Sequence, residues 1–243
     1  MTARRGGATS LLLVRHGESA ANVAASTAEA AGAEVVEMPL RDADVPLTLV
    51  GADQAEALGA RLAALAAAEY PRSVWVSPYQ RARETASIAL AGRPADCRIR
   101  QDERLRDREL GILELLTSRG VEQRLPAEAA RRRRLGRFYY RPPGGESWPD
   151  VALRVRSFLE VLDTDDCDPH ALVVAHDAVL LLFRVVCEGL TEVDALQLAR
   201  TEPVLNASVT KLVRTDRDSP WRVEWYNDVS HLHTEAESRV LPE

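Results

Sequence analysis

The sequence predicts an α/β fold of three layers, α/β/α, with a mainly parallel central sheet and helices on both faces. Three short apolar runs carry this prediction: "LLLV" at residues 11–14, "SVWVS" at 73–77 and "ALVVAH" at 171–176. Continuous apolar runs are typical of strands buried on both faces, and their alternation with helical segments indicates a parallel sheet covered by helices. The 243 residues suffice for one core and contain no internal repeat or Gly/Ser-rich linker, so we expect one domain over residues 1–243.

The first half of the chain alternates helices with strands. Residues 19–30 are Ala-rich and are predicted to be helical. Thr48 is placed to cap the next helix, which Pro71 ends and whose apolar face consists of Ala55, Leu58, Leu62 and Leu65. Residues 81–90 follow the second apolar run and a proline, and are predicted to be a third helix. Residues 97–100 are expected to form a short strand.

The second half is predicted to open with a lid. Residues 102–147 are highly charged and irregular in pattern, so we expect an insertion over the site rather than a part of the core. Ser147 and Asp150 match a capping box, and the helix that follows has an apolar stripe at Val151, Val155, Phe158, Leu159 and Leu162. A further helix is expected over "AVLLLFRVVC". Segments 208–214 and 221–225 alternate enough to form a closing strand pair.

Composition limits the classes of function. The net charge is −6, so the chain as a whole is not built to coat nucleic acid or an anionic membrane. The three cysteines are widely spaced and match neither a metal pattern nor a disulfide framework, and no apolar run is long enough for a signal peptide or a membrane span. We expect a cytoplasmic protein with no metal, membrane or nucleic-acid partner. Its oligomeric state is left open, with a homodimer as one option.

Polar residues end all three apolar runs. The first run leads into Arg15-His16-Gly17, the second into "SP" with Arg81 one turn later, and the third into His176-Asp177. Because the carboxyl ends of parallel strands meet in one crevice, two histidines and two arginines are expected to converge there. Arginine forks and helix N-termini bind anionic oxygens. The sequence therefore predicts a site for a dianionic phosphoryl group.

Several segments carry a resemblance to a known family. These are "LVRHGES" with Asn22, "PLTLVGADQAEALG", "SPYQRARETA", "LRDRELG", "GGES" and "VVAHD", which together extend from residue 11 to 177. In this order they resemble the histidine phosphatase superfamily, also called phosphoglycerate mutase-like. The resemblance implies a three-layer α/β/α fold and a metal-independent reaction on a small phosphate ester.

The resemblance also implies roles for individual residues. His16 would be the nucleophile that takes the phosphoryl group, Arg15, Arg81 and His176 would hold its oxygens, and Asn22 would add a polar contact. The chemistry fits these residue types, because an imidazole attacks phosphorus only when unprotonated, and adjacent arginines disfavour the imidazolium form of a histidine. Phosphoryl transfer requires mainly positioning and charge stabilisation, which arginines and histidines supply.

The proton donor for the leaving group has more than one candidate. Family members of this kind usually carry a glutamate where "LRDRELG" places Asp107, which is one methylene shorter. Asp177 is the second candidate, since the "HD" pair is similar to the acid phosphatase branch, although a carboxylate at a helix N-terminus is also simply stabilised by the helix dipole. Glu109 is the third and would point elsewhere if its segment is extended. Asp107 is our first choice.

Weaker expectations concern substrate contacts. The Ser19 hydroxyl, Asp177 and the Glu146-Ser147 pair are candidates for touching the substrate. The run Arg131–Arg134 has three interpretations: a solvated helix face, a contact to a second anionic group of the substrate, or a nucleic-acid contact. The acidic chain disfavours the last of these.

The function predicted is a metal-independent phosphomonoesterase that works through phospho-His16. Phosphoglycerate mutase is the alternative, and it alone would require 2,3-bisphosphoglycerate as a cofactor. Ala21 stands where the mutase-like block has tryptophan, and "MPLRDADVPLT" lacks the mutase substrate block, so both departures favour the phosphatase. A non-catalytic phospho-ligand-binding regulator is the third reading.

Overall fold

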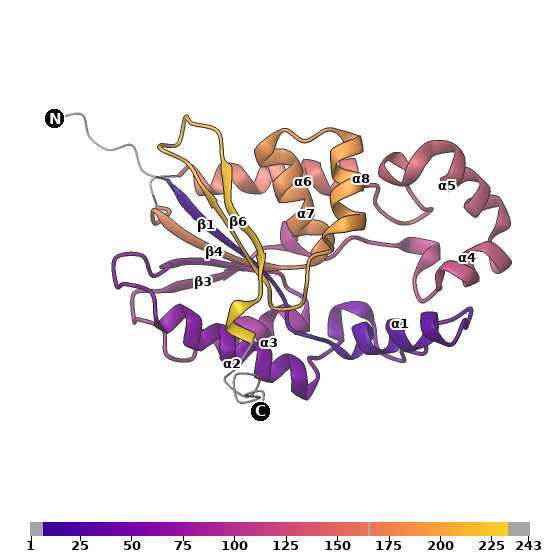
Figure 1. The fold of residues 1–243 in the computed structure, drawn as a ribbon, viewed down its shortest axis with the longest axis horizontal. Helices are drawn as coiled ribbons and strands as arrows, with labels where there is room; N and C mark the ends of the chain where they lie inside the picture. Colours follow the sequence, from indigo (N-terminus) through magenta and orange to yellow (C-terminus); the bar gives the residue numbers. More distant parts are fainter. Residues whose placement is uncertain (1–6, 165, 233–243) are drawn as a thin grey trace, which may run out of the picture.

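The computed structural model describes residues 7–164 and 166–232, and its centre is a six-stranded sheet (Figure 1). The strand order is β3-β2-β4-β1-β5-β6. The bounds are β1 Ser10–Arg15, β2 Ser73–Val76, β3 Arg98–Gln101, β4 His170–Ala175, β5 Val209–Val213 and β6 Arg222–Asp228. The pairs among β1 to β4 are parallel, while β5 and β6 close the sheet as an antiparallel pair. The predicted α/β fold with a mainly parallel sheet is confirmed.

Helices cover both faces of this sheet. In Figure 1, α2 (Leu49–Ala63) and α3 (Gln80–Ala89) lie below it, and α6 (Trp148–Leu162), α7 (Asp177–Glu188) and α8 (Glu192–Thr201) lie above it. The remaining long helix of the first half, α1 (Ala20–Ala30), extends from the end of β1 to the side. No helix in the described part of the chain is both long and apolar enough to cross a membrane.

The apolar runs of the sequence are explained by burial on alternating faces. Leu11 and Leu13 of β1 pack into the core formed with α6 and α7, whereas Leu12 and Val14 pack into the core formed with α2 and α3. Successive side chains of a strand point to opposite faces, so a central strand needs an apolar residue at every position. Arg15 is level with Ala175 and Val76 with Val174, so β1, β2 and β4 end together.

The predicted caps are confirmed, and one helix end differs. Thr48 and Ser147 accept hydrogen bonds as N-caps of α2 and α6, and Ser19 does the same for α1. The helix after Thr48 ends at Ala63, well before Pro71, because the chain turns back toward β2 there. Leu65 still packs against the core, but from the turn.

Residues 102–147, whose role as a lid stays a prediction and which we call the lid for brevity, are more regular than their sequence pattern indicates. This segment contains α4 (Ser118–Arg124) and α5 (Pro126–Tyr139). The two helices pack around a separate small core formed by Leu113, Val121, Ala129 and Tyr140. The expectation of irregular structure was wrong, because the charged side chains that obscure the helical pattern point to solvent, while few apolar residues face inward. The extent of the whole chain as one domain stays a prediction.

The lid is joined to the loop after α1. A bridge links Val35 to Leu116, the amide of Val36 donates to the carbonyl of Leu115 at 2.8 Å, and Thr117 Oγ1 donates to the carbonyl of Ala33 at 2.6 Å. Two segments about 80 residues apart in the sequence are therefore fixed to each other.

Candidate active site

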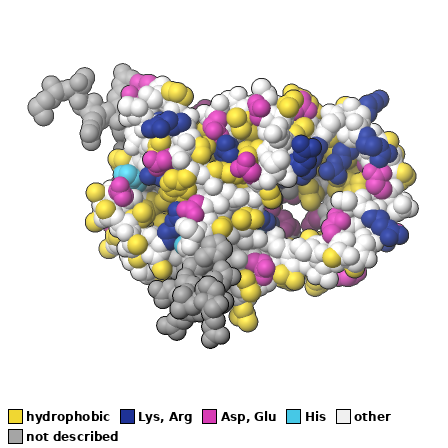
Figure 2. Space-filling model, viewed as in Figure 1, with side chains coloured by type: hydrophobic (Ala, Val, Ile, Leu, Met, Phe, Trp, Pro, Cys, Tyr) yellow, Lys and Arg dark blue, Asp and Glu magenta, His cyan; other side chains and the backbone are white. Residues whose placement is uncertain are grey.

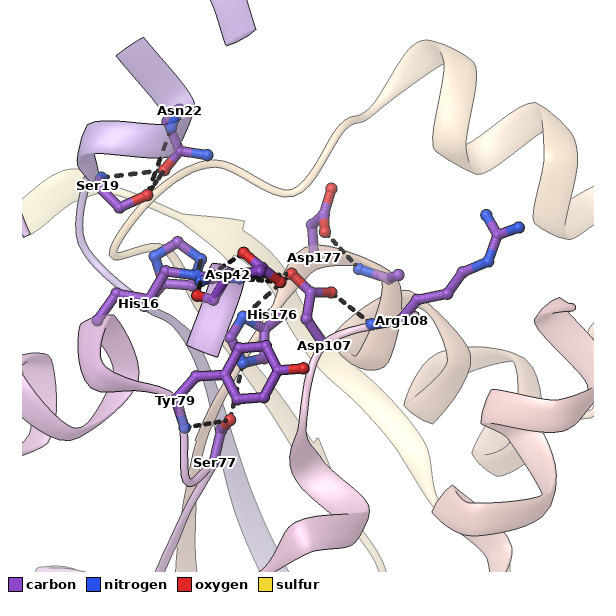
Figure 3. Close-up of polar contacts among 12 residues, drawn as sticks. His16, Ser19, Asn22, Asp42, Ser77, Tyr79, Asp107, Arg108, His176 and Asp177 are labelled. Atoms are coloured by element: carbon purple, nitrogen blue, oxygen red, sulfur yellow. Dashed lines mark hydrogen bonds and ion pairs between the residues drawn. The ribbon is translucent and has the colours of Figure 1, made fainter. Parts of the chain in front are cut away.

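The three strand ends bring the two predicted histidines together (Figure 3). His16 follows β1 and His176 follows β4, with ring centroids 5.1 Å apart. Arg81 reaches the same place from the first turn of α3. All three side chains are buried: the exposed fraction is 2% for His16, 3% for Arg81 and 0% for His176. The convergence at the carboxyl edge of the sheet occurs as these residues' positions in the sequence indicate.

The surroundings of His16 leave one ring nitrogen available for attack. Its Nδ1 lies 2.7 Å from the carbonyl of Gly17 and donates to that oxygen, so Nε2 carries the lone pair and accepts from Arg81 Nε at 3.3 Å. Burial, His176, Arg81 and Arg15 hold the pKa of His16 well below its ordinary value of 6.5. A neutral, correctly oriented imidazole is the form that a phosphorus nucleophile requires.

Gly17 is needed for this orientation. A Cβ atom at residue 17 would lie 2.4 Å from the carbonyl oxygen of Gly51, a backbone atom that cannot swing aside. The close approach also allows the Gly17 amide to donate to Thr85 Oγ1 at 3.0 Å. The glycine of the "RHG" triplet therefore allows the tight backbone turn that orients the His16 side chain.

His176 is held by Ser77, which ends the second apolar run and had no predicted role. Its Nε2 lies 2.8 Å from Ser77 Oγ, and that oxygen accepts from the amide of Tyr79 at 3.3 Å. Asp107 Oδ2, a carboxylate oxygen close to Nδ1, favours the His176 tautomer with its proton on Nδ1, and Ser77 then donates to Nε2. This Nδ1 is buried and lies 3.3 Å from Asp107 Oδ2, but outside hydrogen-bond geometry. Burial, Arg81, Arg15 and Arg154 lower the pKa of His176 well below 6.5.

Arg81 is surrounded by two carboxylates, one of which the sequence did not suggest. Its Nε donates toward His16 Nε2 at 3.3 Å, Nη2 donates to Asp107 Oδ2 at 2.9 Å, and Nη1 donates to Asp42 Oδ1 at 2.9 Å and to its carbonyl at 2.7 Å. Burial, opposed by Arg81, raises the pKa of Asp42 above its ordinary value. Asp42 begins the short 3-10 helix η1 (Asp42–Asp44), and no motif marks it.

The three candidate proton donors lie in different places. Asp107 lies next to both Arg81 and His176: its Oδ2 accepts from Arg81 Nη2 and lies 3.3 Å from His176 Nδ1. Its Oδ1 accepts from the amide of Arg108 at 2.8 Å. Asp177 begins α7, and its carboxylate accepts from the amide of Ala178 and points away from His176 (Figure 3). Glu109 accepts from the Tyr79 hydroxyl at 3.1 Å.

The predicted phosphate contacts Arg15 and Asn22 line the same cavity as His16. Arg15 Nη1 donates to the carbonyl of Val204 at 2.6 Å, and its buried Nε has no hydrogen-bond partner among the described residues. Asn22 Oδ1 accepts from Ser19 and from Asn206 Nδ2, at 3.2 Å. Asn206 also donates to the carbonyl of His16 at 3.1 Å, and no sequence motif marked it.

Two of the expected substrate contacts lie elsewhere. Glu146 accepts from Arg106 and Arg154, and Ser147 caps α6, so both serve the base of the lid. Neither lines the cavity, whereas Ser19 and Asp177 do.

The cavity has a volume of about 480 Å³. Figure 2 shows an opening on this side of the molecule, between the lid helices and α1. Arg108 and Arg137 line it, and neither has a carboxylate within ion-pair distance in the part of the chain that is described. None of Arg131–Arg134 lines it, and Arg131 and Arg133 pair with Glu128 and Glu122 on the lid. Within the described ranges, no group of three or more His, Cys, Asp and Glu side chains is arranged to hold a metal ion.

Comparison with known proteins agrees with the fold and the motifs. Residues 11–229 match the family described as the histidine phosphatase superfamily (branch 1). A phosphoglycerate mutase-like protein of Arabidopsis thaliana is 36% identical over 191 residues, which cover 74% of this chain and 54% of that protein. The chain thus spans about half the length of this relative. A metal-independent phosphoserine phosphatase of Arabidopsis thaliana is 29% identical over 92% of this chain and 83% of that protein.

Solved structures give the same result. The YhfR protein of Bacillus stearothermophilus superposes with a TM-score of 0.73 and 30% identity, covering 93% of this chain and all of that one. A mycobacterial glucosyl-3-phosphoglycerate phosphatase solved with VO3 has a TM-score of 0.70 and 25% identity, covering 90% of this chain and 99% of that one. With the ordered motifs and the converging histidines, the family match over residues 11–229 shows that this chain belongs to the histidine phosphatase superfamily.

Proposed function

We propose that this chain is a metal-independent phosphomonoesterase that hydrolyses a small phosphate ester through a phosphohistidine on His16. One observation carries the proposal: beside the unprotonated Nε2 of His16, two buried nitrogens have no hydrogen-bond acceptor among the described residues. They are His176 Nδ1 and Arg15 Nε. Buried polar atoms are almost always hydrogen-bonded, so the pair is suited to the oxygens of a bound phosphoryl group.

The first step forms the phosphohistidine. His16 Nε2 attacks phosphorus, the bond from phosphorus to the ester oxygen breaks, and the leaving alkoxide takes a proton from Asp107. Arg15, Arg81 and the Nδ1–H of His176 stabilise the phosphoryl oxygens as charge shifts. A dianion beside Arg81 also lies close to the carboxyl groups of Asp42 and Asp107, which compete with it for the guanidinium.

The second step returns the enzyme to its starting state. A water molecule attacks phosphorus, the bond between phosphorus and Nε2 breaks, and the carboxylate of Asp107 accepts the proton of the water. Inorganic phosphate leaves, and His16 is again neutral, since its buried environment disfavours the imidazolium.

The names of the relatives leave both a phosphatase and a mutase to consider, and the sequence favours the phosphatase. Ala21, at the position of the mutase tryptophan, lines the cavity and leaves more space there. A mutase must also retain its bisphosphorylated intermediate until one phosphoryl group returns to the histidine, and an open cavity favours its escape.

The test is a phosphatase screen over sugar phosphates, nucleotides and phosphoglycerates, with and without EDTA. We expect His16→Ala to abolish phosphate release, and His170→Ala, a half-buried histidine at the opposite end of β4, to retain it. Phosphate release that persists in His16→Ala would overturn the mechanism. Conversion of 3-phosphoglycerate that depends on 2,3-bisphosphoglycerate and exceeds phosphate release would turn the assignment to a mutase.

A further inference from the structure

Three leucines are exposed although they face into the cavity. Leu40 is 45% exposed, Leu110 42% and Leu115 39%, and all three line the same cavity as His16 and Arg81. A single exposed leucine on a convex surface needs no explanation. Several on a concave wall beside polar groups are the usual composition of a ligand site.

This apolar wall, formed by Leu40, Leu110 and Leu115, comes from two segments that are fixed to each other. Leu40 belongs to the loop after α1, whose Val36 and Met38 line the same cavity. The other two leucines belong to the lid. The Val36 amide donates to the Leu115 carbonyl at 2.8 Å, so the loop and the lid form one continuous surface.

The backbone of Leu115 is held in a conformation that leucine disfavours. Its φ is 60°, in the left-handed region, where a non-glycine residue is uncommon and strained. Such strain persists only where surrounding contacts impose it, and it is frequent at ligand clamps. Here the Val35–Leu116 bridge and the Val36 hydrogen bond impose it, and they keep Leu115 at the cavity wall instead of in the small core of the lid.

We propose that the alcohol portion of the substrate is an apolar chain or ring that packs on Leu40, Leu110 and Leu115. This inference rests on the proposed phosphomonoesterase function and names its substrate class. The phosphoryl group occupies only the end of the cavity at His16, and a volume of about 480 Å³ leaves the greater part to the alcohol. Cavities of roughly 300–1,000 Å³ bury most of the surface of ligands much larger than a three-carbon acid.

A series of n-alkyl phosphates from ethyl to octyl tests the inference. All release primary alkoxides of similar basicity, so the chemical step is matched and only the buried apolar area grows. Each buried methylene contributes about 0.8 kcal/mol, or about fourfold. We expect kcat/KM to rise about two- to fourfold per methylene until the cavity is filled. A flat or falling series, with phosphate release still dependent on His16, would overturn the inference and leave the proposed function intact.

Binding of n-alkylphosphonates, which cannot be hydrolysed, separates the two claims. We expect their Kd to fall by the same factor for each methylene added to the alkyl group, whether or not the protein hydrolyses any ester. A steep binding series without hydrolysis would support the apolar wall and contradict the phosphatase. A Kd independent of chain length would contradict the apolar wall.

Variants locate the effect. The double variant Leu40→Ser/Leu110→Ser changes two exposed side chains, and we expect it to flatten the dependence of Kd on chain length by at least half. Leu153→Ser is the matched control, because Leu153 is 63% exposed on α6 and does not line the cavity. Equal flattening in the control, or an unchanged dependence in the double variant, would refute the assignment of these leucines.

Discussion

Replacing Asp42 by asparagine is expected to tighten the binding of inorganic phosphate. Asp42 and Asp107 share the guanidinium of Arg81, one positive charge between two negative ones. A phosphate dianion at Arg81 must approach the Asp42 carboxylate or displace it. The amide of asparagine keeps the shape and the hydrogen-bonding oxygen of the side chain but removes its charge.

The magnitude follows from the charge and the exposure of Asp42. Two unit charges about 4 Å apart interact by about 1 kcal/mol in water and by about 4 kcal/mol at an effective dielectric constant near 20. The Asp42 side chain is 40% exposed, which places the repulsion at the weaker end of this range, about 1–2 kcal/mol. We therefore expect Kd for phosphate to fall about 5- to 30-fold in Asp42→Asn.

The assay is titration of phosphate against wild type, Asp42→Asn and the control Asp44→Asn as a function of pH. Asp44 lies two residues away and pairs with Arg41 instead of Arg81, so its loss should change Kd little. Because the pKa of Asp42 is raised, its charge is lost as pH falls. The ratio of Kd between wild type and Asp42→Asn, in which the ionisation of phosphate cancels, should then approach 1 at acidic pH. Equal or weaker binding by Asp42→Asn at neutral pH would refute the reasoning.

Further predictions concern the proton donor, pH and packing. Asp107→Asn should slow hydrolysis of an alkyl phosphate about 10²- to 10⁴-fold but that of 4-nitrophenyl phosphate far less; the assignment fails if Asp177→Asn shows this pattern instead. Because His16 and His176 are neutral in the folded state and their pKa values lie well below 6.5, the unfolded chain binds more protons in acid. The free energy of unfolding should fall as pH drops below about 6.5, and it should fall less steeply in His176→Ala. The same dependence of this free energy on pH in both proteins would contradict the prediction. Phe158→Ala, which removes a fully buried ring between Trp75 and Phe183, should cost about 3–5 kcal/mol in urea unfolding; a cost below 1 kcal/mol would show that the core collapses around it.

Much of the fold, and the convergence of the two histidines with Arg81, could be predicted because local patterns carry them. Burial on both faces makes β1 and β4 continuously apolar, and polar residues at their ends stand out. The positions of His16, Arg81 and His176 then follow from the geometry of a parallel sheet.

The remaining features depend on contacts between distant segments. Asp42 is 39 residues from its partner Arg81 in the sequence, and Asn206 is 190 residues from His16. Neither Asp42 nor Asn206 belongs to a sequence motif. The role of Ser77 was visible only once His176 was placed beside it. The helices of the lid were missed because their apolar residues serve a small core of four side chains, too few to give a clear period.

Trapping the covalent intermediate tests the central claim most directly. Wild type and His16→Ala are mixed with a substrate labelled in the phosphoryl group, quenched in base during turnover, digested and analysed by mass spectrometry. The account predicts a phosphoryl group on the peptide that contains His16, stable in base, lost in acid and absent from His16→Ala. Turnover by wild type with the phosphoryl group on another residue would contradict a mechanism in which His16 is the nucleophile.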